Sequence, residues 1–407
     1  MTNSSELRGG VNSLRHKLRP IAQFLAREDV TEIVINRPGE VGVESRAGWE
    51  WFEVEKLTYQ DLDAIATLAA SIWQQDVGPD HPLCGSTLPD GQRIQICRPP
   101  AVAAGTISLT IRRPSNFTPT VEKLDAGGLF DRTVGASARV NPADMELMEL
   151  HALKRWKEFF PCAVRAKKTI IATGDTGSGK TTFAKALIQE IPRHERLITI
   201  EDTAEFIGLP QRNLVSLFYS KGHQGVARVR SEELIEAALR MRPDRVLMQE
   251  LRDGAAYTFV RSIAAGHPGS ITTCHAGSAQ GAFDALRLMI KQHEAGKHLA
   301  DADARGLLMS LVDIVVHCRR GSDGFGIEEV YFDPSVKAAA IAAELETKVK
   351  AKARSKPTGG MRKDGSEKKR GGDRGDREAS SRTDGTDELS GRGARLCGFT
   401  LAGTKER

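Results

Sequence analysis

The sequence predicts an α/β protein with three parts: a smaller α+β domain, a phosphate-loop nucleotide-binding domain and a charged tail. The 407 residues are enough for two domains. In the second half, short apolar runs alternate with helical segments, which is typical of a doubly wound, mostly parallel sheet. We therefore expect an N-terminal α+β domain, a linker, a nucleotide-binding domain and a low-complexity charged tail, spanning residues 1–113, 114–140, 141–335 and 336–407.

Composition sets limits on the class of protein. The hydrophobic content of 40% and charged content of 27% are ordinary for a globular protein, and the net charge of +5 is small. No run of about 18 apolar residues exists, and the first residues lack an apolar signal core. We expect a cytosolic location. Six cysteines without a C-x-x-C pair exclude a sequence-readable zinc module, and we expect them to fill the core.

The N-terminal part has the alternation typical of half-buried strands. Residues 31–36 and 41–44 flank a turn at 37–39, which predicts a hairpin, and apolar spacing predicts a helix over 57–73. Two further strands are expected at 93–97 and 107–112. Period two places Arg93 and Arg112 on the faces of these strands that point away from the core. By this pattern alone they are either surface charges or functional groups.

A helix is expected to begin after the linker. Asn141 is a good N-cap, Pro142 suits the first helical position and Asp144 complements the helix dipole. Apolar residues continue through Phe160, and we expect Pro161 to end the helix. Residues 348–395, by contrast, are rich in Lys, Arg, Glu, Asp, Gly and Ser. They cannot bury enough surface to fold, and we expect them to be disordered, as a solvated tail rather than a binding segment for nucleic acid or lipid.

The strongest motif is a phosphate loop between a short apolar strand and a helix. It matches G-x-x-x-x-G-K-[ST] and extends over Gly174, Asp175, Thr176, Gly177, Ser178, Gly179, Lys180, Thr181 and Thr182. The glycines allow backbone N–H groups to face a phosphate, and the helix N-terminus adds positive charge. Lys180 is expected to reach the β- and γ-phosphates and Thr181 to bind Mg²⁺. The guanine-specific N-K-x-D motif is absent, which favours ATP.

Later strands each end in polar residues, and such ends meet at one edge of a parallel sheet. Residues 245–250 have the form of a Walker B strand, so Glu250 is expected beside Mg²⁺, directly or through a water. Glu201, with Asp202 after it, ends another strand and is the first candidate for the general base. Glu250 is the alternative base. His275 ends a further strand.

These residues resemble a known superfamily, the type II and type IV secretion ATPases. Residues 199–206 (TIEDTAEF) resemble its aspartate box, residues 242–252 its Walker B region, and residues 266–276 (GHPGSITTCHA) its histidine box. The resemblance covers roughly residues 15–334. Within the superfamily the chain is most similar to the traffic ATPases of Vir-type type IV secretion systems. The charged tail departs from that family.

The resemblance implies a RecA-like domain, Mg²⁺-dependent ATP hydrolysis and a homohexamer that energises substrate transport, pilus biogenesis or both. It also implies peripheral attachment to the cytoplasmic face of the inner membrane and contact with membrane subunits of the secretion system. His267 and His275 would sense the γ-phosphate, with Arg93 and Arg112 close to the nucleotide and Arg113 a rival of Arg112. The alternatives are a RecA-like nucleic-acid motor, a pilus or type II secretion ATPase, and a non-enzymatic nucleotide-binding scaffold.

Overall fold

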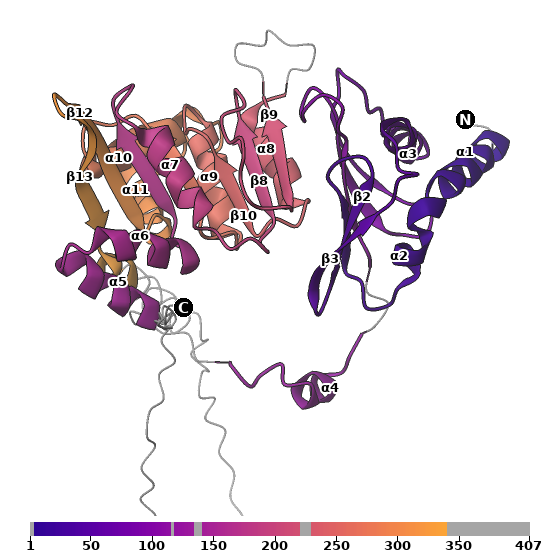
Figure 1. The fold of residues 1–407 in the computed structure, drawn as a ribbon, viewed down its shortest axis with the longest axis horizontal. Helices are drawn as coiled ribbons and strands as arrows, with labels where there is room; N and C mark the ends of the chain where they lie inside the picture. Colours follow the sequence, from indigo (N-terminus) through magenta and orange to yellow (C-terminus); the bar gives the residue numbers. More distant parts are fainter. Residues whose placement is uncertain (1–3, 115–117, 134–140, 220–228, 340–407) are drawn as a thin grey trace, which may run out of the picture. The chain divides into compact units, whose positions relative to one another are not determined.

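The computed structural model describes residues 4–114, 118–133, 141–219 and 229–339. Within them, the N-terminal part is a six-stranded antiparallel sheet with helices packed against it (Figure 1). Its strand order is β3-β2-β1-β6-β5-β4. The strands are β1 (Glu32–Ile35), β2 (Glu40–Ser45), β3 (Gly48–Glu53), β4 (Leu83–Thr87), β5 (Arg93–Cys97) and β6 (Ser108–Arg112). The helices are α1 (Ser4–Lys17), η1 (Arg19–Ile21), α2 (Ala22–Ala26) and α3 (Tyr59–Ser71).

Alternating apolar residues explain this sheet. The predicted hairpin is β1 and β2, extended by β3, and the predicted helix is α3, which begins after a capping box made by Thr58 and Asp61. The strands β5 and β6 pair antiparallel with Arg93 directly opposite Arg112. Ile94 and Ile111, one residue further in, are buried, whereas both arginines are exposed. The expected outward direction of the two arginines is therefore confirmed.

The segment after the sheet differs from the prediction in two ways, because the one helix expected up to Phe160 is two helices and because Pro161 does not end a helix. A short helix, α4 (Val121–Ala126), lies within the expected linker. Asn141 caps α5 (Pro142–Ala152) by accepting a hydrogen bond from the Asp144 N–H, as expected. Pro161, however, does not end a helix but lies inside α6 (Trp156–Arg165). Phe159 and Phe160 before it and Ala163 and Val164 after it are buried, and this burial offsets the lost backbone hydrogen bond.

The second half forms the expected parallel sheet. β8 (Leu197–Glu201) lies between β10 (Arg245–Met248) and β9 (Leu214–Phe218), and β7 (Ile170–Gly174) lies between β11 (Ile271–Cys274) and β12 (Ile314–Gly321), all parallel. The two sets of strands adjoin at β10 and β11, where the Leu251 N–H donates to the Thr273 carbonyl at 2.7 Å. β13 (Gly324–Phe332) is antiparallel to β12 and forms the edge.

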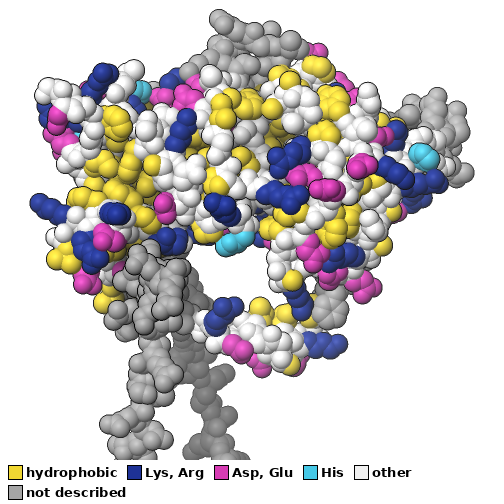
Figure 2. Space-filling model, in the orientation of Figure 1, with side chains coloured by type: hydrophobic (Ala, Val, Ile, Leu, Met, Phe, Trp, Pro, Cys, Tyr) yellow, Lys and Arg dark blue, Asp and Glu magenta, His cyan; other side chains and the backbone are white. Residues whose placement is uncertain are grey.

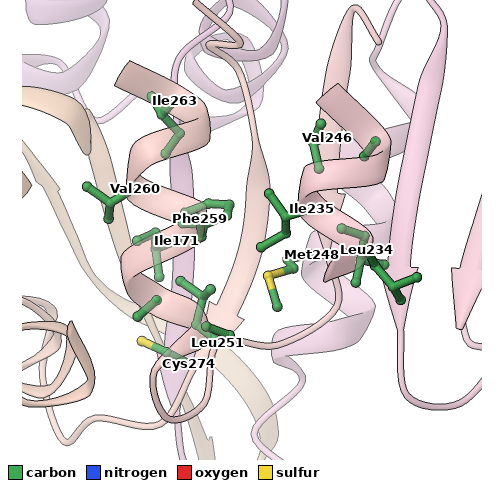
Figure 3. Packing of buried hydrophobic residues seen from close by; sticks show 14 of the residues in the cluster. Ile171, Leu234, Ile235, Val246, Met248, Leu251, Phe259, Val260, Ile263 and Cys274 are labelled. Atoms are coloured by element: carbon green, nitrogen blue, oxygen red, sulfur yellow. The ribbon is translucent and has the colours of Figure 1, made fainter. Parts of the chain in front are cut away.

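Helices cover this sheet with apolar side chains. They are α7 (Lys180–Gln189), α8 (Ser231–Leu239), α9 (Ala255–Ala264), α10 (Ala279–Gln292) and α11 (Asp301–Leu311). In Figure 3, Ile235 of α8 lies toward Met248 of β10, and Phe259 of α9 lies beside Ile171 of β7. This burial on both faces explains why the strands are continuous apolar runs. Because the strands are parallel, the carboxyl ends of β7, β10 and β11 lie at the same edge of the sheet.

Composition predicted the environment of the cysteines and the character of the tail. Five of the cysteines are free and buried, as expected of core residues, while Cys397 lies outside the described residues. The tail predicted to be disordered also lies outside them.

On the face shown in Figure 2, Lys and Arg side chains are interspersed with Asp and Glu. No helix in the described part of the chain is long and apolar enough to cross a membrane.

Candidate active site

The phosphate loop connects β7 to α7 in the predicted order. Gly174, Gly177 and Gly179 have φ angles of 140°, 77° and 89°, a region that side chains rarely tolerate. Space is restricted as well, because a Cβ at Gly174 would lie 2.1 Å from the Cys318 carbonyl oxygen. Gly179 is the N-cap of α7 and adopts the left-handed conformation. The glycines therefore give the backbone a turn that other residues cannot adopt without strain.

Lys180 is buried at the first position of α7. Its ammonium donates hydrogen bonds to the carbonyls of Gly174 and Asp175, both at 2.8 Å. Burial lowers the pKa of Lys180, and the negative charge of Glu250 opposes that shift. Lys180 therefore lies within the phosphate loop, where its charge interacts with that of Glu250, the expected Walker B acid. Thr181 follows it and is half-buried, and Thr182 is exposed.

Glu250 and His275 are brought together at the carboxyl ends of β10 and β11. Glu250 Oε1 lies 3.1 Å from His275 Nε2, and the Glu250 carboxylate also forms an ion pair with Arg252. The His275 side chain is 47% exposed, whereas the Glu250 side chain is 16% exposed and its Oε1 is buried. An acid and an imidazole next to a phosphate-loop lysine can orient a water and contact a phosphate.

Glu201 has a different environment. It is 1% exposed, and its two carboxylate oxygens are occupied by other groups. Oε1 accepts from the Thr199 hydroxyl at 2.6 Å, and Oε2 accepts from the backbone N–H groups of Glu205 and Phe206 at 2.8 and 2.9 Å. These bonds hold the chain after β8 in place. The geometry therefore favours Glu250 over Glu201 as the acid that acts on a nucleotide.

The residues around Glu201 are also positioned by side chains that the sequence did not single out. The Asp202 N–H donates to Gln249 Oε1 at 3.0 Å, and the Thr273 hydroxyl donates to the Gln249 carbonyl at 2.9 Å. Arg252 lies 3.7 Å from Asp202 in addition to its contact with Glu250. Gln249 and Arg252 thus link the ends of β8, β10 and β11. Their place directly beside the Walker B acid is the sequence signal that could have identified them.

Arg93, Arg112 and His267 lie elsewhere. They line a separate cavity of about 1040 Å³ together with Leu239, Arg240, Arg242 and Pro243, which precede β10. His267 likewise precedes β11, and burial lowers its pKa. In parallel strands the amino ends lie at the edge opposite to the phosphate loop. Within one chain, therefore, Arg93, Arg112 and His267 are not brought to the loop that holds Lys180, whereas Glu250 and His275 are.

Arg112 and Arg113 are distinguished by their contacts. Arg112 is 72% exposed, 3.7 Å from Glu32 at the wall of the cavity. Arg113 turns to the other side and donates to the Arg27 carbonyl. Of the two rivals, Arg112 is the one available to a ligand.

Mg²⁺ was expected between Thr181 and Glu250. Mg²⁺ is usually held by one or two carboxylates together with substrate phosphates and water. The negative charge of Glu250 acts on Lys180. Apart from its contact with His275, Glu250 Oε1 has no hydrogen-bond partner among the described residues. No cluster of three or more His, Cys, Asp or Glu able to hold a metal occurs in the described ranges. A single acid beside a phosphate loop is sufficient for a Mg²⁺ that is bound mainly by the phosphates of a nucleotide.

Together, the RecA-like sheet, the phosphate loop and the acid beside it define a phosphate-loop ATPase. A family model described as "Type II/IV secretion system protein" matches residues 138–371. The chain is 45% identical over 329 residues to the type IV secretion system protein VirB11 of Bartonella henselae, covering 78% of this chain and 92% of that protein. It is 39% identical over 321 residues to the protein VirB11 of Agrobacterium fabrum, covering 78% and 93%.

A solved structure agrees with these similarities. The VirB11 ATPase from the Brucella suis type IV secretion system, crystallised in complex with sulphate, matches with a TM-score of 0.79 and 39% identity, over 83% of this chain and 99% of that chain. The chain therefore belongs to the type II/IV secretion system family, among its VirB11-type ATPases. It is an ATP-hydrolysing enzyme, and the predicted fold class is confirmed.

Proposed function

We propose that the protein is a homohexameric ATPase that energises a type IV secretion system by Mg²⁺-dependent ATP hydrolysis, for translocation of substrate, pilus biogenesis or both. The observation that carries the catalytic part is the convergence of Lys180, Glu250 and His275 at one edge of the sheet. Peripheral association with the inner membrane and contact with membrane subunits of the secretion system belong to the same proposal. They rest on the similarity to VirB11 proteins.

The chemistry follows from the positions of the side chains. The loop amides and Lys180 bind the phosphates, and Thr181 and Glu250 would hold Mg²⁺, which supplies charge neutralisation on the phosphate oxygens when bound. Glu250 orients the attacking water, and its neighbour His275 contacts the γ-phosphate. Glu201, with both oxygens occupied, shapes the loop that includes Asp202 and Glu205.

Assembly into a ring would give a role to the residues that lie away from the phosphate loop of their own chain. Arg93 and Arg112 are exposed at the edge opposite to the phosphate loop, so in a ring they are available to the nucleotide of a neighbouring copy. Guanidinium groups supplied in this way neutralise charge in the transition state. His267, beside them, belongs to the same surface. The domain division into residues 1–113, 114–140 and 141–335 is part of this proposal.

Substitution of Lys180 tests the proposal. Lys180→Ala removes the cation from the loop and is expected to lower ATP hydrolysis about 100-fold or more. Lys185→Ala, also on α7 but outside the loop, is the matched control and retains activity. ATP turnover by purified Lys180→Ala at the wild-type rate would contradict the phosphate-loop assignment. Stimulation of the wild-type enzyme by DNA, surviving deletion of residues 340–407, would favour the nucleic-acid motor instead.

A further inference from the structure

The hairpin of β12 and β13 follows the phosphate loop along its length. A Cβ at Gly174 would meet the Cys318 carbonyl, one at Gly177 would lie 3.6 Å from Arg320 Nη1, and one at Gly179 would lie 2.6 Å from the ring of Phe325. Three successive glycines of the loop are thus each covered by a different residue of the hairpin. The role assigned above to the phosphate loop uses none of these hairpin residues.

Arg320 and Phe325 act as a pair. They are directly opposite each other in the antiparallel register of β12 and β13, so their side chains lie on one face of the hairpin. Phe325 is 63% exposed, which is unusual for a phenyl ring. Arg320 is exposed and makes no hydrogen bond or ion pair with any described residue. Its neighbour Arg319, in contrast, is paired with Glu328 at 2.8 Å.

An exposed ring beside an unpaired guanidinium is the combination that binds a nucleobase and its phosphates. Aromatic rings stack on bases, and arginine contributes to stacking and to phosphate binding. Glycines flank Phe325 on both sides, at positions 324 and 326, and leave the faces of the ring accessible.

We propose that Phe325 stacks on the adenine of the bound nucleotide and that Arg320 contacts its phosphates, so that the β12–β13 hairpin forms the wall of the site facing the phosphate loop. This rests on the nucleotide site proposed above. A nucleotide with its terminal phosphates in the loop carries its base only one phosphate and one ribose away. The ring of Phe325 against Gly179 lies within that reach.

The test separates the base from the phosphates by comparing two ligands. Calorimetry on the full chain measures binding of ADP and of inorganic tripolyphosphate, which has no base. Phe325→Ala is expected to weaken ADP binding on the order of tenfold and to leave tripolyphosphate binding within about twofold. Phe325→Trp retains ADP binding. Arg320→Ala weakens binding of both ligands, and Arg319→Ala, the matched control on the opposite face, weakens neither.

Each outcome has a distinct meaning. If wild-type protein binds ADP, Lys180→Ala abolishes that binding and Phe325→Ala leaves it unchanged, the role of the hairpin is overturned while the nucleotide site stands. Equal losses of ADP and tripolyphosphate in Phe325→Ala would also overturn it, because they would indicate a distorted loop. If wild-type protein binds neither ligand, or Lys180→Ala binds both normally, the proposed nucleotide site fails and the hairpin proposal fails with it.

Discussion

Glu250 and His275 lie at the ends of adjoining strands, with Oε1 of the acid 3.1 Å from Nε2 of the imidazole. They are 25 positions apart in the sequence, and neither is close to Lys180 along the chain. The charge of Glu250 nevertheless acts on Lys180. Three groups from three elements therefore form one chemical unit at the edge of the sheet.

The different environments of Glu250 and Glu201 predict different effects of the same substitution. Glu250→Gln removes a charge that faces Lys180 and is expected to lower turnover about 100-fold or more. Glu201→Gln should retain most activity, because the amide oxygen can still accept from the Glu205 and Phe206 N–H groups. Steady-state ATPase assays with a check of nucleotide binding compare the two. Greater loss in Glu201→Gln than in Glu250→Gln would restore Glu201 as the base.

If the exposed arginines serve a neighbouring copy, two inactive variants should complement each other. Arg112→Ala retains an intact loop, and Lys180→Ala retains intact arginines, so mixed assemblies contain some complete sites. ATPase activity of the mixture is expected to exceed the sum of the separate activities. A mixture of Arg112→Ala with Arg93→Ala serves as control, since these residues lie side by side on the same surface. Purely additive activity in the first mixture would argue against sites shared between copies.

Gly179 and Gly91 provide a matched pair for the phosphate loop, with φ angles of 89° and 90°. Gly91→Ala adds a methyl group to open space, so only backbone strain of about 1–2 kcal/mol is expected. Gly179→Ala suffers the same strain and also collides with the ring of Phe325. Urea unfolding should show a larger loss of stability for Gly179→Ala, partly relieved by adding Phe325→Ala. Equal losses for both alanine variants would show that the ring does not restrict the loop.

Glu32 makes stability depend on pH. Burial raises the pKa of Glu32 from 4.5 to about 7, with Arg112 opposing and Glu44 adding to the shift. The folded protein therefore holds this proton more tightly than the unfolded chain. Stability is lost as pH rises from about 4.5 to 7, by on the order of 3 kcal/mol in total.

Comparison with Glu32→Gln isolates this effect. The variant cannot ionise at this position, so its stability, measured by denaturant unfolding between pH 4.5 and 8, should fall less than that of the wild type. The exposed Glu55→Gln is the control and should follow the wild-type profile. Parallel profiles for wild type and Glu32→Gln would contradict a raised pKa in the folded state.

Local patterns predicted much of the fold. The capped start of α5, the strands β5 and β6 and the phosphate loop all depend on residues within a few positions of one another. Pro161 shows the limit of such inference, because burial of Phe159 and Val164 on either side allows the helix to continue through it. The position of His267 shows a second limit. It belongs to the same motif as His275, but His267 precedes β11 and His275 follows it, so the two lie at opposite edges of the sheet.

Nucleotide binding can be inferred from local pattern alone, since the loop from Gly174 to Thr182 requires only neighbouring residues and a strand and helix on either side. The sequence also contains the acids and histidines that are candidates for a role in hydrolysis. Their environments depend on long-range folding. Hydrogen bonds with Thr199, Glu205 and Phe206 occupy the Glu201 carboxylate, whereas the adjoining ends of β10 and β11 bring Glu250 to His275. The contact of Phe325 with Gly179 likewise depends on the folding of β13 against β12, and no local pattern contains it.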